Sequence, residues 1–450
     1  NNFTDEIIDD RRQELQRDSM HLESYGISLN WQHEWSARFE SNLKVIGTIY
    51  DYSYLYGISG FQSNNEKLRG SKSNMIADRQ IHLSNKYTKD NSQIYEIGYH
   101  LINYNIQFRV TEQSNNSKDI DDKGDSNSFL HSMYFTFNNP IKKGIGVNAG
   151  FRASYFDISG KVYLEPRLQL SRELNSNFSI HANYGRHHQY VTLISVFRGN
   201  QNGINSPLWA LTEGKGIPVV KADVFQLGTI FNKSGWVIDV QGYKKKIQGV
   251  SSRTYDFDVL ESDQAIIGSS DVIGMDVMIN KRLGTVESWL SYTYSKSQFN
   301  FPGLSKNDFY SDFDQRHILQ FTSKLDLGHW TFGLGINYST GLPYSRINDF
   351  DVINQPGEPL EYVLEYDGIN NHRLNAMSEL NVSVNYNFSS PSESWDAVIS
   401  FSLINSLNKE NIYSRNYYVE RLNNMPADIY FLDKSNLTVT PNLGFRIVWH

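Results

Sequence analysis

The sequence predicts an all-β fold, a transmembrane antiparallel β-barrel, from three observations. The mean hydropathy is −0.50, yet 14% of the residues are aromatic. Apolar and polar residues alternate with a period of two along nearly the whole chain, and the connections between the alternating segments are short and long in turn. Together these observations favour strands that cross a membrane with one apolar and one polar face.

The low hydropathy excludes a helical membrane protein, because no stretch approaches the roughly 18 apolar residues that a transmembrane helix needs. A chain this polar can cross a bilayer only as a barrel, in which the closed sheet satisfies every backbone group. The absence of Cys agrees with passage through an oxidising periplasm. The net charge of −7 argues against nucleic acid as a partner.

The alternation is strictest in residues 145–155, where one face carries Ile145, Val147, Ala149, Phe151, Ala153 and Tyr155. Residues 332–338 and 380–388 repeat the pattern. We predict about 17 strands, with ends uncertain by roughly 2 to 4 residues. They span residues 18–35, 41–56, 77–87, 92–112, 128–138, 144–157, 162–172, 177–189, 219–232, 235–249, 270–282, 285–298, 315–326, 329–340, 377–388, 396–408 and 439–450.

The connections between the predicted strands alternate between short and long. Short turns are predicted near residues 36–40, 88–91, 139–143, 173–176, 233–234, 283–284, 327–328 and 389–395. Long polar loops are predicted at residues 57–76, 113–127, 190–218, 250–269, 299–314, 341–376 and 409–438, and only the connection at 158–161 breaks the rule. Outer-membrane barrels have short periplasmic turns and long extracellular loops, whereas propellers and sandwiches have no reason to sort their loops in this way.

The alternation of short and long connections predicts the direction in which each strand crosses the membrane. If the short turns are periplasmic, the first strand runs inward, residues 1–17 form part of an extracellular loop, and the last strand ends in the periplasm. Residues 1–450 then form one barrel domain. Because bacterial barrels have an even number of strands, we expect an odd number of strands to precede Asn1.

No motif predicts catalysis, a cofactor or a metal site. Residues 119–124 resemble the start of a calcium loop, but Lys123 occupies a ligand position and Leu130 stands where a bidentate Glu belongs, which favours a solvated acidic loop. His187 and His188 are adjacent in a predicted strand and point to opposite faces, which favours a structural role. We therefore expect that the protein is not an enzyme.

The long loops combine aromatic and cationic residues, which can stack on or hold an organic ligand. Equally, these side chains can pack loop against loop or lie among lipopolysaccharide headgroups. The predicted ligand-binding residues are Arg198, Trp209, Tyr310, Tyr344, Arg346, Arg415, Tyr417 and Tyr418.

A series of strings resembles the barrel of TonB-dependent outer-membrane receptors, particularly the form common in Bacteroidota. In chain order they are LEPRLQLSREL (164–174), NYGRHHQYVTLIS (183–195), PLWAL (207–211), KADVFQLG (221–228), SYTYSKSQFNF (291–301), DFDQRHILQF (312–321), YSTGLPY (338–344) and SLINSLNKEN (402–411). Residues 1–163 fit the family by strand pattern alone. The chain departs from the family at its end, where Trp449 precedes His450 and the family commonly ends in an aromatic residue.

The resemblance implies a barrel of about 22 strands, of which roughly 5 would precede this sequence. It also implies an N-terminal plug domain, absent from this chain, and a TonB box that engages the inner-membrane energy-transducing complex. The expected partners are outer-membrane lipid and lipopolysaccharide, the TonB complex, and a surface lipoprotein if a neighbouring gene encodes one.

Three functions stay open from the sequence. The first is a TonB-dependent receptor that imports a siderophore, glycan, peptide or cobalamin across the outer membrane. The second is a structural or assembly subunit of a larger outer-membrane complex built on the same barrel. The third is a soluble all-β protein such as a propeller. The sequence does not identify the ligand, because the specificity is expected to lie in the long loops and in the plug.

Overall fold

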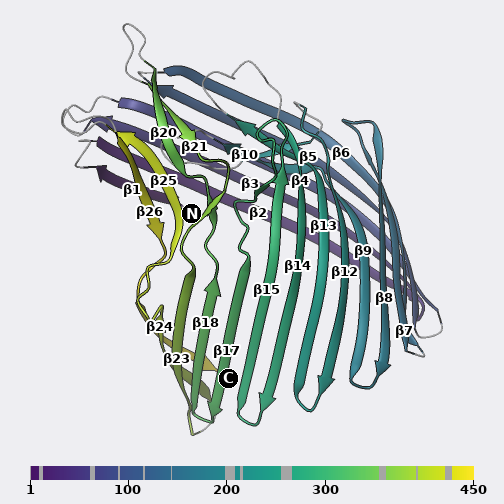
Figure 1. Ribbon diagram of the computed structural model, residues 1–450. Helices are drawn as coiled ribbons and strands as arrows, with labels where there is room; N and C mark the ends of the chain where they lie inside the picture. Colours follow the sequence, from purple (N-terminus) through teal and green to yellow (C-terminus); the bar gives the residue numbers. More distant parts are fainter. Residues whose placement is uncertain are drawn as a thin grey trace.

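The fold is one large, curved antiparallel sheet, as the sequence predicts (Figure 1). The computed structural model describes residues 2–9, 14–60, 66–89, 92–114, 117–142, 144–197, 208–212, 216–254, 266–353, 361–391, 394–420 and 428–450. Within these ranges we find no helix with the length and apolar character of a membrane span.

The 17 predicted segments each correspond to one strand of this sheet, and each strand pairs with the next along the chain. The strands are β2 (Glu14–Ser36), β3 (Phe39–Gly60), β4 (Glu66–Lys89), β5 (Gln93–Ser114), β6 (Ser117–Lys142), β7 (Ile145–Phe156), β8 (Lys161–Asn175), β9 (Phe178–Gln189), β12 (Val220–Lys233), β13 (Trp236–Thr254), β14 (Ile266–Leu283), β15 (Val286–Asn300), β17 (His317–Leu327), β18 (Trp330–Ser339), β23 (Met377–Ser389), β24 (Trp395–Ile404) and β27 (Thr440–Trp449).

Smaller strands lie between or beside them. β1 (Asn2–Asp9) pairs with β2 at the edge of the sheet. β10 (Val191–Phe197) pairs with the end of β13. The others are β11 (Leu208–Leu211), β16 (Phe309–Tyr310), β19 (Pro343–Tyr344), β20 (Ile347–Ile353), β21 (Glu361–Tyr366), β22 (His372–Arg373), β25 (Ile412–Glu420) and β26 (Asp428–Ser435).

Two predicted loops, 57–76 and 113–127, are largely strand instead. The β3–β4 ladder continues to Ser59 opposite Glu66, and the β5–β6 ladder continues to Ser114 opposite Ser117. Polar side chains suit a ladder with water on both faces, and the ladder satisfies backbone groups that a loop would leave to solvent. The acidic residues 119–124 accordingly lie in β6, where Asp121 forms an ion pair with Arg109 at 2.9 Å.

The first residues of the chain also form a β-strand. β1 pairs with β2 from Asn2 opposite His21 to Asp9 opposite Glu14. Residues 1–17, predicted as an extracellular loop, thus include a strand and the beginning of β2. The side of the membrane on which they lie stays a prediction.

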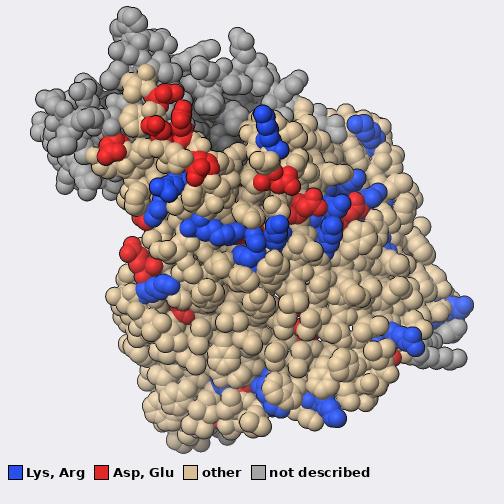
Figure 2. All heavy atoms as spheres, in the orientation of Figure 1, with Lys and Arg blue, Asp and Glu red and all other residues tan. Residues whose placement is uncertain are grey.

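One face of the sheet exposes large apolar side chains. On β12 and β14 this outer face carries Phe225, Leu227 and Ile273, which are 52%, 66% and 53% exposed. Figure 2 shows a broad zone almost free of charged side chains over β12 to β17. So much exposed apolar surface is unfavourable in water and matches a wall in contact with lipid.

The opposite, inner face is polar. The Asp276 carboxylate accepts a hydrogen bond from Thr293 at 2.8 Å and one from Gln241 at 3.3 Å, joining β13, β14 and β15 across their inner side chains. Such cross-strand bonds satisfy polar groups that an apolar medium would leave unpaired. The face to which each residue points therefore follows the predicted period of two.

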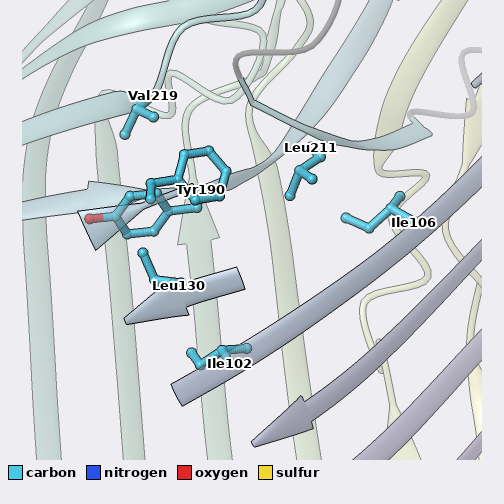
Figure 3. Close-up of a cluster of buried hydrophobic side chains, with 7 residues drawn as sticks. Ile102, Ile106, Leu130, Tyr190, Leu211 and Val219 are labelled. Atoms are coloured by element: carbon cyan, nitrogen blue, oxygen red, sulfur yellow. The ribbon is translucent and has the colours of Figure 1, made fainter. Parts of the chain in front are cut away.

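The described parts of residues 190–219 pack against the inner face of β5 and β6. Tyr190, Leu211 and Val219 pack against Ile102 and Leu130 in a buried apolar cluster (Figure 3). These partners lie on the face opposite the exposed side chains of the same strands, as the 52% exposed Ile97 on β5 shows. This segment therefore narrows the space that the sheet encloses.

A cation introduced at mid-height on β13 should destabilise the protein much more on the outer face than on the inner face. Val240 lies on the outer face opposite Val277, so we expect Val240→Arg to lower the free energy of unfolding in lipid vesicles by about 2–4 kcal/mol. Gln241→Arg, one residue away on the inner face, is the control and should cost less than about 1 kcal/mol. Denaturant titration in vesicles measures both values, and equal losses would contradict the assignment of the faces.

Candidate ligand-binding site

Rings and guanidinium groups from three loops meet at the end of the sheet remote from the short turns. The loops are residues 301–316, which follow β15, 340–376, which follow β18, and 405–439, which follow β24. β20, β21, β25 and β26 mark this end in Figure 1. We use the name loop cluster for Tyr310, Arg316, Tyr344, His372, Arg373, Arg415, Tyr417 and Phe431.

Asp314 anchors the first half of the loop cluster. Its side chain is fully buried, and its carboxylate accepts a hydrogen bond from the Ser297 backbone N–H at 2.7 Å. It also pairs with Arg316 at 3.2 Å and directly with Arg373. Both guanidinium groups lie over the Tyr310 ring, 5.0 Å and 5.2 Å from its centroid. One buried carboxylate thus positions two cations against one ring.

Asn370 supplies a second tie between the same two loops. Its side-chain amide donates to the Tyr310 backbone carbonyl at 2.9 Å and to the Asp312 carboxylate. The backbone N–H of Asn370 donates to Ser345 Oγ at 3.0 Å, and its φ of 52° is one that Asn tolerates better than most residues. Burial raises the pKa of Asp312, while the hydrogen bond from Asn370 opposes this shift.

The second half is built on the β25–β26 hairpin. Arg415 faces Asp433 across the hairpin and donates two hydrogen bonds to its carboxylate, at 2.6 Å and 2.7 Å. These bonds lower the pKa of Asp433 and keep the pair charged at neutral pH. The same guanidinium lies 5.4 Å from the Tyr344 centroid and 4.2 Å from that of Phe431. A charge paired so closely is held in one orientation against both rings.

The short β19–β22 ladder joins the two halves. It sets Tyr344 opposite His372 and Pro343 opposite Arg373. His372 contacts the Tyr344 ring at 5.8 Å, whereas its neighbour Arg373 reaches Tyr310. Tyr344 also stacks with Tyr417 at 6.3 Å. The loop cluster is therefore one continuous set of rings and cations.

Four of the predicted ligand-binding residues enter the loop cluster, namely Tyr310, Tyr344, Arg415 and Tyr417. Arg346 lies nearby at the start of the β20–β21 hairpin with an exposed side chain. Arg198 lies outside the described residues. Tyr418 has a described backbone, paired with Tyr430, but its side chain lies outside the described part.

Trp209 lies apart, on the segment that folds against the inner face. The Asn74 side chain of β4 accepts from the Trp209 backbone N–H at 2.8 Å and donates to its carbonyl at 3.1 Å. Asn74 is only 2% exposed, so this paired contact fixes β11 to the wall. Trp209 is thus placed inside the mouth of the sheet rather than in the loop cluster.

The sequence did not single out four further members of the loop cluster, Arg316, His372, Arg373 and Phe431, or the buried carboxylate of Asp314. The string DFDQRHILQF contained two of these residues, but nothing local distinguishes a buried Asp from a solvated one. Phe313, in the same string, is 85% exposed beside Asp314, and its exposed ring is a further candidate contact.

The adjacent histidines do not meet other potential ligands in a metal-binding group, and no such group occurs among the described residues. His188 Nδ1 lies 3.4 Å from the buried Glu165 carboxylate, and the His188 ring contacts Tyr163 at 5.1 Å. These contacts hold His188 of β9 against β8.

Residues 1–412 match a protein family described as "TonB dependent receptor-like, beta-barrel". No curated protein sequence matches the chain. Among solved structures, the ferric yersiniabactin uptake receptor FyuA from Yersinia pestis has a TM-score of 0.64 and 11% identity, over 97% of this chain and 62% of that one. The ferric citrate transporter FecA has a TM-score of 0.60 and 14% identity, over 98% and 63%.

A third solved structure, the copper transporter OprC, has a TM-score of 0.61 and 12% identity, over 89% of this chain and 64% of that one. The chain thus spans about 62% to 64% of the length of these proteins. At such low identity the likeness is one of fold alone.

Removing the buried charge of Asp314 should loosen the first half of the loop cluster. Asp314→Asn leaves two guanidinium groups near each other without their carboxylate, and breaking a buried pair in this way typically costs about 3–5 kcal/mol. We expect faster backbone hydrogen exchange in residues 297–316 and 370–374. Asp308→Asn in the same loop, where the carboxylate accepts one exposed hydrogen bond from Asn300 at 2.7 Å, is the matched control. Equal exchange in the two variants would contradict the anchoring role.

Proposed function

The chain belongs to the TonB-dependent receptor-like β-barrel family, and we propose that it is the greater part of a receptor that imports a scarce or bulky organic solute. The protein is an outer-membrane protein, as its family and fold establish. The solved structures that it resembles are named as receptors and transporters, not as enzymes.

The observation that carries the proposal is the meeting of rings and guanidinium groups from three loops at one end of the barrel. Tyr310, Tyr344 and Tyr417 offer flat apolar surfaces, and Arg316, Arg373 and Arg415 lie beside them. Such a surface can stack on a ring of a ligand and donate hydrogen bonds to its carboxylate or hydroxyl oxygens. The expected solute is a siderophore, glycan, peptide or cobalamin.

The names of two of the similar structures, which refer to ferric chelates, support a solute of this kind. The three names refer to uptake of ferric yersiniabactin, transport of ferric citrate and transport of copper. Trp209, held inside the mouth by Asn74, would meet a solute that has passed the loop cluster. A barrel this wide leaks unless it is filled. We therefore include in the proposal a plug domain and a TonB box outside residues 1–450, powered by the inner-membrane complex.

We also propose that the protein is of the Bacteroidota form of the family and that a surface lipoprotein is its partner. The strings between residues 164 and 411 support the first of these, and the long loops 340–376 and 405–439 offer area for the second. The predicted loop residues Arg346 and Tyr418 would then serve this contact or the solute.

Uptake assays on cells that make the full-length protein test the function. We expect energy-dependent uptake of at least one labelled ferric siderophore, oligosaccharide, peptide or cobalamin, lost when TonB is deleted. The double variant Tyr344→Ala/Arg415→Ala should reduce uptake at low solute concentration by about tenfold or more, because removing stacking and charge-assisted contacts each costs about 1 kcal/mol.

Lys281→Ala is the matched control, since Lys281 lies 4.7 Å over the Trp236 ring at the short-turn end, far from the loops. It removes a similar cation and ring contact and should leave uptake unchanged. Uptake of no tested solute, together with co-purification of a stable outer-membrane complex, would instead support the assembly-subunit hypothesis.

A further inference from the structure

Cations gather on the outer face of the barrel, directly above the apolar wall. Figure 2 shows Lys and Arg side chains in a band across β12 to β15, on the side of the loops. We use the name outer basic band for the outward cations of β9, β12, β13 and β15, which are Arg186, Lys221, Lys244, Lys246 and Lys296. Two carboxylates, those of Asp223 and Asp271, lie in the same rows.

The strand registers place these side chains in successive rows near the loop end of the strands. Lys246 is paired with Asp223 on β12 and with Asp271 on β14. Two residues lower, Lys244 is paired with Phe225 and Ile273, and Ile273 in turn with Lys296. Alternate residues share a face, so all of these side chains point outward with the exposed Phe225 and Ile273.

Apolar surface begins immediately below. The next outward residues on β12 and β14 are Leu227 and Met275, 66% and 40% exposed. They lie one further pair of residues down the strand, roughly 6.6 Å along its axis. The cations therefore lie at the level where lipid headgroups meet acyl chains.

Most of the positive charge in this band is unpaired. Arg186 and Asp223 form an ion pair at 2.8 Å. Lys244 and Lys246 are exposed, and neither they nor Lys296 form an ion pair with a carboxylate among the described residues. The band is thus cationic within a chain whose net charge is −7.

We propose that the outer basic band binds the phosphate groups of a phosphorylated lipid in the outer leaflet. Lys244, Lys246 and Lys296 contact the phosphates, and the acyl chains lie on Phe225 and Leu227 below them. A lipid fits better than a soluble anion, because only an amphiphile covers the cations and the exposed apolar wall together. This site is on the outside of the barrel and is independent of solute import.

The test compares lipid bound to the purified full-length protein and to the triple variant Lys244→Gln/Lys246→Gln/Lys296→Gln. Lipopolysaccharide is the probe, measured by native mass spectrometry and by titration in detergent. We expect the triple variant to bind at least about tenfold more weakly, because each basic residue near an anionic lipid surface contributes several-fold to affinity. The wild-type protein should bind enzymatically dephosphorylated lipopolysaccharide as weakly as the variant binds the intact form.

Lys245→Gln is the matched control, since Lys245 lies between two band residues in sequence but points to the inner face. It should retain wild-type binding. Equal affinity of the triple variant and wild type, or an equal loss in Lys245→Gln, would overturn the proposal. Displacement of the bound lipid by millimolar inorganic phosphate would also overturn it, because the band would then be a site for a free anion.

Discussion

The structure depends on one constraint, which is that every backbone N–H and C=O inside a bilayer needs a partner within the protein. The continuous ladder from β2 to β27 meets this need for every strand that has a neighbour on both sides, because each strand pairs with the next in chain order. Once the ladder exists, alternate side chains must point to lipid and to the interior. The exposed Leu227 and the hydrogen-bonded Gln241 are two results of this single geometry.

Outside the membrane, water can pair with backbone groups, and other interactions hold the loops in place. The loops bury some apolar side chains, such as Phe301 and Phe309, and buried polar groups also hold them together. Asp314 forms ion pairs with Arg316 and Arg373, which come from different loops. The side-chain amide of Asn370 donates a hydrogen bond from the second of these loops to the first. These polar contacts hold the loops together and leave the rings of Tyr344 and Phe431 available at the surface of the cluster.

The strands could be predicted because the alternation that defines them is local. The extensions of β4 and β6 could not, since polar residues such as Asp121 fit a hydrated ladder as well as a loop. Residue type alone selected Tyr310, Tyr344, Arg415 and Tyr417 as ligand-binding residues; the structure brings them into one cluster, and their role in binding stays a prediction. Arg373 and Asp314 were missed because their role comes from a contact across 59 residues of chain, and Trp209 was grouped with them although Asn74 holds it elsewhere.

We expect the loop cluster to face the cell exterior and the short turns to face the periplasm. Residues 1–450 contain no Cys, so cysteines introduced there report position once any Cys elsewhere in the full-length protein has been replaced. Intact cells making the full-length protein with Asn307→Cys or Ser234→Cys would be treated with a thiol reagent that cannot cross the outer membrane. The account expects labelling at residue 307 in intact cells and at residue 234 only after the membrane is permeabilised. Labelling at residue 234 alone in intact cells would contradict it.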